Sequence, residues 1–188
     1  MSELFSIQLQ NRQQQGRDGV WLDLPTTTEQ VQAALRQIGI SSDNLQGLFI
    51  SGYFAEEEKR FAIPYNMVLA SNVDELNFLA SRLETLSTGE RTELNAALQV
   101  PQSELSSIGR ITDFPENVDY YVHLPDVRGP AQLGDYYLNR SGMVDMPEEW
   151  KGGIDTAQFG RYVAQQEQGV FTQYGYLVKS GDEWQKVH

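Results

Sequence analysis

The stretch GVWLDLPTTTEQVQAALRQIG, residues 19–39, carries the signals of a strand and of a helix side by side. Residues 19–25 form a short β-rich run that ends at a proline, as a strand does. Thr26 and Glu29 then show the spacing of a capping box, which predicts the start of a helix. A strand followed directly by a capped helix indicates a mixed fold.

The expected helix has one apolar face and a defined end. Val31, Leu35 and Ile38 recur at helical spacing, so they share the side that would be buried. Gly39 fits the position just after a helix, where a left-handed backbone is common. We therefore expect the helix to end at this glycine.

Two further runs on either side of this stretch are typical of strands. Residues 3–10 (ELFSIQLQ) alternate apolar and polar side chains, and residues 47–54 (GLFISGYF) are β-rich. The first 60 or so residues are therefore expected to form a small sheet with one helix.

Helical patterns dominate residues 63–110. Asn72 can cap a helix, and Ser87 with Glu90 shows capping-box spacing before a second helix that Pro101 would end. The apolar face of the first helix is formed by Val73, Leu76, Leu79, Ala80 and Leu83. Short helices of this kind bury little alone, so we expect them to pack on each other and on a neighbouring module.

Residues 111–188 return to mixed structure. The expected elements are a strand at 118–124, a helix from Pro130, a single turn at 147–150, a helix capped by Asp155 and a hairpin at 170–178. The sequence thus predicts an α+β fold class with three small modules. They are a β-sheet plus helix (1–62), a helical middle (63–110) and an acidic α+β module (111–188).

Composition narrows the class of protein. The chain has 188 residues, a net charge of −12 and no cysteine, which excludes disulfides and thiolate metal sites. The first residues lack the basic and apolar regions of a signal peptide, and no apolar stretch is long enough to span a membrane. Because phosphates would repel so acidic a protein, direct nucleic-acid binding is not expected. We expect a cytoplasmic protein with no membrane contact.

The acids concentrate between Ile111 and Asp155, where nine acids stand against three bases. The net charge of this segment is −6, half of the net charge of the chain. The acids are dispersed among aromatic residues and turns, which indicates a charged surface on a folded scaffold rather than a disordered tail. Such a surface attracts basic sites on a partner.

Candidate catalytic residues are few. His123, in a β-rich run, is the one internal histidine that could act as a base, and a structural role is its default interpretation. No P-loop, nucleophile elbow or dinucleotide fingerprint is present. Asp145, Glu148 and Glu149 leave open a weak divalent-cation site or a carboxylate hydrolase, although their spacing matches no EF-hand loop. We expect no enzyme, no cofactor and no metal site.

The aromatic residues of the last module are expected mostly in the core, with some in a partner or subunit interface. They are Tyr120, Tyr121, Tyr136, Tyr137, Trp150 and Tyr162.

At this point the motifs, taken in order, resemble those of the ArdA antirestriction proteins. The resemblance begins with GVWLDLP at 19–25 and covers the chain from about residue 5 to residue 179. The motifs that follow in family order are DELNFLA (74–80), LGDYY (133–137), MPEE (146–149), ID with FGR (154–161) and GVFTQYGY (169–176).

The resemblance implies a function and a set of partners. ArdA-like proteins are encoded on plasmids and conjugative elements, and they protect incoming DNA. They imitate bent B-form DNA and occupy the DNA-binding groove of type I restriction-modification enzymes, formed by the methyltransferase core. They are elongated homodimers of three modules, and surface carboxylates stand in for phosphates.

Carried onto this chain, the resemblance implies which acids act as phosphate mimics. They are Asp113, Glu116, Asp119, Asp126, Asp135, Asp145, Glu148, Glu149 and Asp155, with Glu56, Glu57 and Glu58 extending the row. Ala157 and Tyr162 stand where the family has acids, so two charges are missing around the FGR motif. Arg161 is expected to pair with a nearby acid, and Gly160 to serve in packing.

One alternative interpretation comes from a different class of protein. The acidity could serve solubility alone, in an interaction module or adaptor without DNA mimicry. Binding that is insensitive to salt and uses a hydrophobic interface would favour that alternative.

Overall fold

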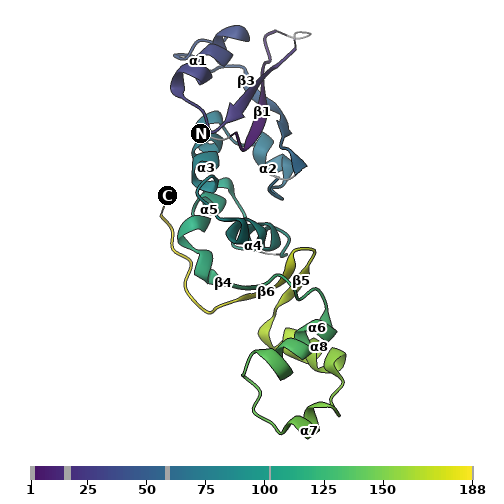
Figure 1. Ribbon diagram of the computed structural model, residues 1–188. Coiled ribbons are helices and arrows are strands. Elements are labelled where there is room, and N and C mark those ends of the chain that lie inside the picture. Colours follow the sequence, from purple (N-terminus) through teal and green to yellow (C-terminus); the bar gives the residue numbers. More distant parts are fainter. Residues whose placement is uncertain (1–2, 15–17, 58–59, 102, 188) are drawn as a thin grey trace. The chain divides into compact units, whose positions relative to one another are not determined.

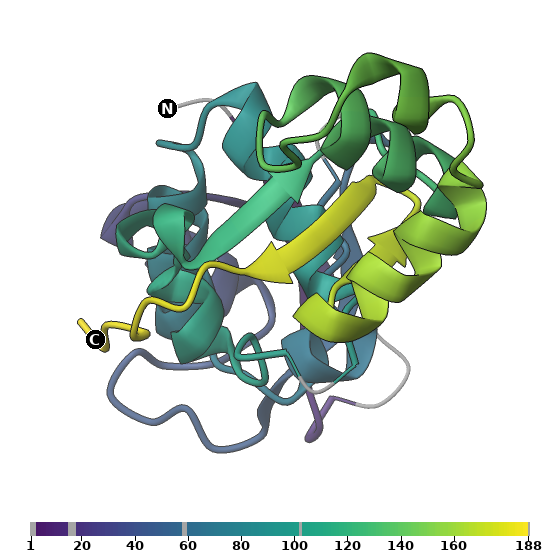
Figure 2. The same ribbon diagram turned by 90° about the horizontal axis from the view of Figure 1, so that it is seen from below.

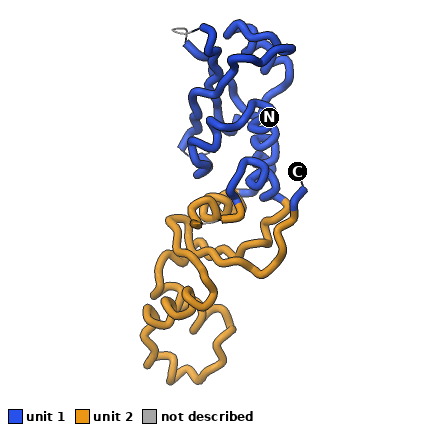
Figure 3. Tube along the Cα trace, turned by 180° about the vertical axis from the view of Figure 1, so that it is seen from behind, with its two compact units in different colours: residues 1–87, 105–115, 186–188 blue, residues 88–104, 116–185 orange. Residues whose placement is uncertain are grey.

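The computed structural model describes residues 3–14, 18–57, 60–101 and 103–187. The chain forms two compact units (Figure 3). Unit 1 comprises residues 1–87, 105–115 and 186–188, and unit 2 comprises residues 88–104 and 116–185. Both units mix strands and helices, which confirms the α+β fold class. The division into three modules stays a prediction.

Unit 1 is built on a three-stranded antiparallel sheet with the order β2-β1-β3 (Figure 1). Its strands are β1 (Phe5–Asn11), β2 (Val20–Leu24) and β3 (Leu48–Phe54). In the central strand, Ile7 lies opposite Leu22 of β2 and Tyr53 of β3. All three strands predicted from the first 54 residues are confirmed.

Helix α1 (Thr28–Gln37) follows β2, with a capping box one residue later than predicted. Thr27 caps the helix by accepting from the backbone N–H of Gln30. The backbone of Thr26 bonds the side chain of Asn77. The Thr26 N–H donates to Asn77 Oδ1 (2.7 Å), and the Thr26 carbonyl accepts from Asn77 Nδ2 (3.1 Å). This tie to a distant residue is a tertiary contact that local spacing does not reveal. Gly39 has a φ of +69°, which confirms the predicted helix end.

The helices of unit 1 complete its core. They are α2 (Tyr65–Leu69), α3 (Val73–Leu83) and α5 (Ile108–Thr112), and α3 packs against α5 and β2. Asn72 caps α3 by accepting from Glu75 N–H at 2.9 Å, as predicted. The whole predicted apolar face of α3 is buried. The short α2 was not expected from the sequence.

Unit 2 contains helix α4 (Thr88–Leu98) and a second antiparallel sheet with the order β4-β6-β5. Its strands are β4 (Tyr121–Leu124), β5 (Val170–Thr172) and β6 (Gly175–Lys179). The hairpin predicted at 170–178 is confirmed. Figure 2 shows β4 paired with β6 in this sheet.

The strand predicted at 118–124 starts late. Residues Phe114–Glu116 (η2) and Val118–Tyr120 (η3) form 3₁₀ turns, and the strand begins at Tyr121. Tyr120 packs edge-on against the Trp184 ring, with centroids 5.1 Å apart. Asn117 side-chain atoms also bond the backbone N–H and carbonyl of Gln185, at 2.7 and 2.9 Å. The 3₁₀ turn at Val118–Tyr120 is thus in contact with residues 184–185, which are distant in the sequence.

The remaining helices of unit 2 are α6 (Pro130–Asp135), the π-helical turn η4 (Tyr136–Arg140), α7 (Glu148–Lys151) and α8 (Thr156–Glu167). Helices α6 and α8 approach backbone to backbone. A Cβ on Gly134 would lie 1.9 Å from Thr156 O, and one on Gly160 would lie 1.8 Å from Pro130 O. Gly160 is therefore a packing residue, as predicted. Around this contact Val127, Leu133, Ala164 and Tyr176 form a buried cluster.

Within the described ranges, no helix combines the length and apolar character needed to cross a membrane.

Candidate functional site

Charge is unevenly divided between the two units. Unit 2 has fourteen acids and six bases, a net charge of −8, while unit 1 has twelve acids and eight bases, a net charge of −4. Unit 2 therefore carries two thirds of the net charge of the chain, and most of the acids predicted as phosphate mimics belong to it.

Most of these predicted acids are exposed. Those of unit 2 are Glu116, Asp119, Asp126, Asp145, Glu148, Glu149 and Asp155, and those of unit 1 are Glu56 and Glu57. Glu58 lies outside the described residues. These seven predicted acids of unit 2 lie in turns, loops and helix starts between η2 and α8. We call this set of seven acids the acidic surface of unit 2.

Asp113 departs from its expected surface position. It belongs to unit 1 and is only 1% exposed, and its carboxylate accepts from the Val187 backbone N–H at 3.3 Å. Its neighbours Ile111, Thr112 and Phe114 are also buried. Asp113 therefore has a structural role. Because an aspartate is almost never fully buried unless it is paired, its charge alone predicted exposure.

Asp135 is half-buried and partly neutralised by its own helix. Arg140 lies 3.1 Å from its carboxylate, and Asn139 Nδ2 donates to it at 2.9 Å. The guanidinium of Arg140 also lies over the Tyr136 ring, 5.8 Å from its centroid. Asp135 therefore presents less charge to a partner than an exposed acid without an ion pair does, and Glu148, which is paired with Lys151 at 2.7 Å, is partly neutralised in the same way.

Asp155 combines exposure with a structural task. It caps α8, and its carboxylate accepts from the Gln158 backbone N–H at 2.9 Å, as the sequence predicted. A negative charge at this end of a helix is also favoured by the helix dipole. The fold therefore fixes the place of this charge.

Sequence reasoning missed Glu93 on α4. Its Oε1 atom is buried and has no hydrogen-bond partner among the residues that the structure describes. Burial, with smaller contributions from Glu90 and Asp119, raises the pKa of Glu93 to about 8. At neutral pH this carboxyl is therefore mostly protonated and adds little charge to unit 2. Local spacing does not mark this burial, because adjacent residues on a helix, such as Glu93 and the buried Leu94, point to different sides.

The aromatic residues of unit 2 divide into two groups. Tyr120 and Tyr121 are buried and Tyr136 and Tyr137 are half-buried. Trp150 and Tyr162 are exposed, so they are not part of the core, and the predicted interface position stays open for them. Exposed aromatic side chains of this kind are enriched at protein interfaces.

A network of hydroxyls around Glu167 closes the end of α8. Tyr176 donates to Glu167 Oε2 at 2.9 Å, and Tyr137 donates to the other carboxylate oxygen. Burial, with the neighbouring Glu167 charge, raises the pKa of both tyrosines well above the usual range. These groups hold α8 and η4 against β6 and are not available to a partner.

Two further residues singled out in the sequence, His123 and Arg161, differ in their contacts. The Nε2 atom of His123 lies 2.8 Å from Tyr174 O and bonds β4 to the β5–β6 turn. Arg161 is exposed and forms no ion pair with a described acid, so its predicted partner is missing among these residues. Nor do the described residues bring three or more His, Asp or Glu side chains together as a metal site.

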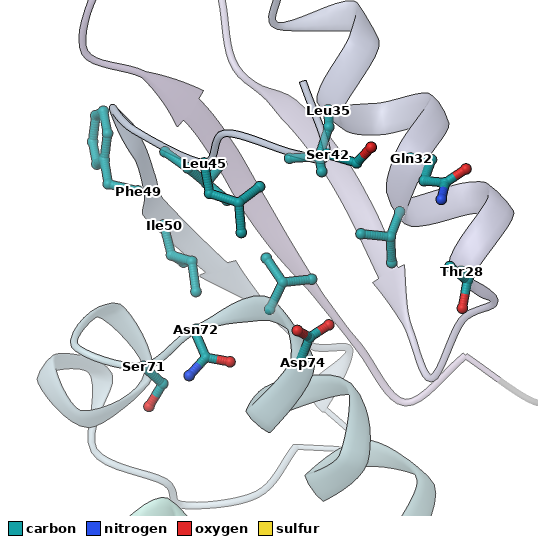
Figure 4. Close-up of a pocket in the computed structure, with 13 residues that line it drawn as sticks. Thr28, Gln32, Leu35, Ser42, Leu45, Phe49, Ile50, Ser71, Asn72 and Asp74 are labelled. Atoms are coloured by element: carbon teal, nitrogen blue, oxygen red, sulfur yellow. The ribbon is translucent and has the colours of Figure 1, made fainter. Parts of the chain in front are cut away.

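Unit 1 contains a groove of about 410 Å³ between α1, β3 and the start of α3 (Figure 4). Leu35, Leu45 and Ile50 contribute to its apolar lining, and Asp74 stands at its rim. Of the acids predicted as phosphate mimics that the structure describes, none lines it. The groove and the acidic surface of unit 2 are separate features.

Comparison with known proteins agrees with the order of motifs. A family model described as antirestriction protein (ArdA) matches residues 15–178, which is most of the chain. A search of curated proteins finds no match. Because the family model spans both units, the match does not depend on one shared module. The chain therefore belongs to the ArdA family of antirestriction proteins.

Proposed function

We propose that the chain acts in antirestriction as a mimic of B-form DNA, which blocks the DNA-binding groove of type I restriction-modification enzymes. The observation that carries this proposal is the acidic surface of unit 2, seven exposed carboxylates on a folded unit of net charge −8. Membership of the family implies an antirestriction function. The charged surface supports DNA mimicry as the mechanism of that function.

The physical basis is charge complementarity with a groove built for phosphates. A DNA-binding groove is lined with Lys and Arg, and duplex DNA binds it largely through the release of condensed counterions. Carboxylates attached to a folded scaffold offer the same sign of charge to the same side chains. Because the scaffold is already ordered, little conformational entropy is lost on binding.

The structure supports a revision of the set of mimicking acids. Glu116, Asp119, Asp126, Asp145, Glu148, Glu149 and Asp155 form its main part, with Asp135 as a weaker member. Glu56 and Glu57 extend the set onto unit 1, and the predicted Glu58 remains in the proposal. Asp113 is left out because it is buried.

Two properties of the complex follow from this mechanism. The protein displays no base edges, so it should inhibit enzymes of different target sequence alike. As a homodimer it would present a net charge of −24, twice that of one chain. The partner is then the methyltransferase core of the enzyme, and no catalytic step belongs to this chain.

A competition titration tests the proposal. A type I methyltransferase core is bound to a labelled duplex, and this protein is added at about 50 mM and about 200 mM salt. We expect displacement near one dimer per enzyme, with affinity falling steeply as salt rises. Affinity that is unchanged between the two salt concentrations would contradict mimicry.

The exposed apolar side chains of unit 2 favour a second candidate, an acidic interaction module without DNA mimicry. Trp150, Tyr162 and Met143 are each more than half exposed. If they form the whole interface, binding to a partner should be insensitive to salt. The same titration separates the two candidates.

A further inference from the structure

We propose that Trp150 is the apolar anchor of the acidic surface of unit 2, and that it packs against lysine and arginine side chains of the partner's groove. This inference rests on the proposed function, since the groove is the one that DNA would occupy. It adds a contact that carboxylates cannot supply.

Trp150 has no role in the core of unit 2. It is 68% exposed, and helix α7, to which it belongs, has no buried residue. Figure 1 shows α7 on the long connection between α6 and α8. Met143, on the same connection, is 74% exposed. An indole that is 68% exposed gains little stability for the fold from burial, and tryptophan is a residue type enriched at protein interfaces.

The turn that carries Trp150 is held in place by its own hydrogen bonds. The backbone N–H of Trp150 donates to Pro147 O at 3.0 Å, and the backbone carbonyl of Trp150 accepts from the Gly153 N–H at 3.0 Å. Lys151 forms an ion pair with Glu148 at 2.7 Å, and its side chain is only 16% exposed. The backbone under the indole is thus ordered before binding, which lowers the entropy lost when an anchor docks.

The surroundings of Trp150 select a basic partner. Glu148 and Glu149 directly precede it, and Asp145 and Asp155 lie on the same connection, all four exposed. These carboxylates attract Lys and Arg, whose aliphatic stems and cationic heads both pack well on an indole face. Tryptophan is enriched among the residues that dominate binding energy, where charged neighbours exclude water from the contact.

Salt dependence distinguishes an anchor from a phosphate mimic. Loss of an apolar contact weakens binding by the same factor at every salt concentration. Loss of a charge lowers the slope of log affinity against log salt. We therefore expect Trp150→Ala to weaken displacement of duplex by about 10- to 100-fold with the salt slope unchanged.

Matched variants define the contact. Trp150→Phe keeps an aromatic ring and should recover part of the affinity. Glu149→Gln, one residue away, should instead lower the salt slope. The chain has three tryptophans, and labelling them with 5-fluorotryptophan gives a direct readout by ¹⁹F NMR of the 188-residue protein. The Trp150 resonance, assigned with Trp150→Phe, should shift when the methyltransferase core is added.

The outcomes separate this inference from the proposed function. If the unaltered protein fails to displace duplex, both are overturned. If the unaltered protein displaces duplex and Trp150→Ala does so equally well, the anchor alone is overturned. If light scattering shows that Trp150→Ala converts a dimer to a monomer, Trp150 covers a second copy of the chain, and the anchor is again overturned. A lower affinity at unchanged mass and salt slope supports it.

Discussion

The carboxyl of Glu93 makes the stability of unit 2 depend on pH. Its pKa is raised from 4.5 to about 8, chiefly by burial, so the folded state keeps a proton that the unfolded state loses. The free energy of unfolding should therefore fall as the pH rises from about 5 to about 9. Above the folded pKa the side chain would be charged while its buried Oε1 atom has no hydrogen-bond partner within the described part of the chain, which is unfavourable.

Glu93→Gln tests this expectation, since a glutamine resembles the protonated acid. We expect the variant to be more stable than the unaltered protein at about pH 9, by about 1–3 kcal/mol, and nearly equal at about pH 5. Urea unfolding at both pH values measures the difference. The exposed Glu149→Gln serves as the control, and an unchanged pH dependence in Glu93→Gln would refute the assignment.

Gly160 shows how closely the backbones of α6 and α8 approach. Because an added Cβ would lie 1.8 Å from Pro130 O, Gly160→Ala forces the helices apart. We expect a loss of about 3 kcal/mol in the free energy of unfolding. Gly152→Ala is a matched control, because nothing lies within 4 Å of a Cβ there. Equal stability of the two variants would mean that α6 and α8 do not pack in this way.

Single residues also show where sequence reasoning stops. The exposure of acids such as Asp126 and Glu148 follows from charge alone and was predicted. Asp113 and Glu93 were not recognised as buried, because burial depends on which segments pack together rather than on local spacing. The aromatic residues were expected mostly in the core with some in an interface, and local sequence did not show that Trp150 is among the exposed ones.

At the scale of elements, the cap of α8 links fold stability to the charged surface. Asp155 both caps the helix and presents a charge, and two substitutions separate these roles. Asp155→Asn keeps an acceptor for Gln158 N–H, so it should retain most of the stability while weakening partner binding. Asp155→Ala loses both, and we expect it to lower the free energy of unfolding by about 1 kcal/mol.

Thermal unfolding and the duplex competition together measure these two effects. If Asp155→Asn destabilises as much as Asp155→Ala does, the charge rather than the hydrogen bond stabilises the helix end.

Elements set by local signals were predicted well, and those set by distant contacts were not. The strands of unit 1, the cap of α3 at Asn72 and the start of α6 at Pro130 each have a signal within a few residues. The capping box of α1 moved by one residue because Asn77 holds Thr26. The late start of β4 goes with contacts to Trp184 and Gln185, about 65 residues away.

At the scale of the whole molecule, the division of charge is what supports DNA mimicry. Unit 2 has the larger net charge and unit 1 the apolar groove, so the two units can be altered separately. The order of motifs along the chain predicted the family, which the family model confirms. The arrangement of carboxylates in space could not be predicted, because it depends on how the turns of unit 2 fold.

The most direct test of mimicry compares two triple variants with equal loss of charge. The first is Asp119→Asn, Asp126→Asn and Asp145→Asn on the acidic surface of unit 2. The second is Asp18→Asn, Asp43→Asn and Asp74→Asn on unit 1, where all three acids are also exposed. Both proteins lose three negative charges, so a general effect of net charge is the same in each.

The measurement is displacement of a labelled duplex from a type I methyltransferase core across a series of salt concentrations. We predict that the unit 2 variant loses affinity by about 10-fold or more and has a shallower salt slope, while the unit 1 variant stays close to the unaltered protein. Equal behaviour of the two variants would contradict the assignment of the DNA-mimicking charge to unit 2.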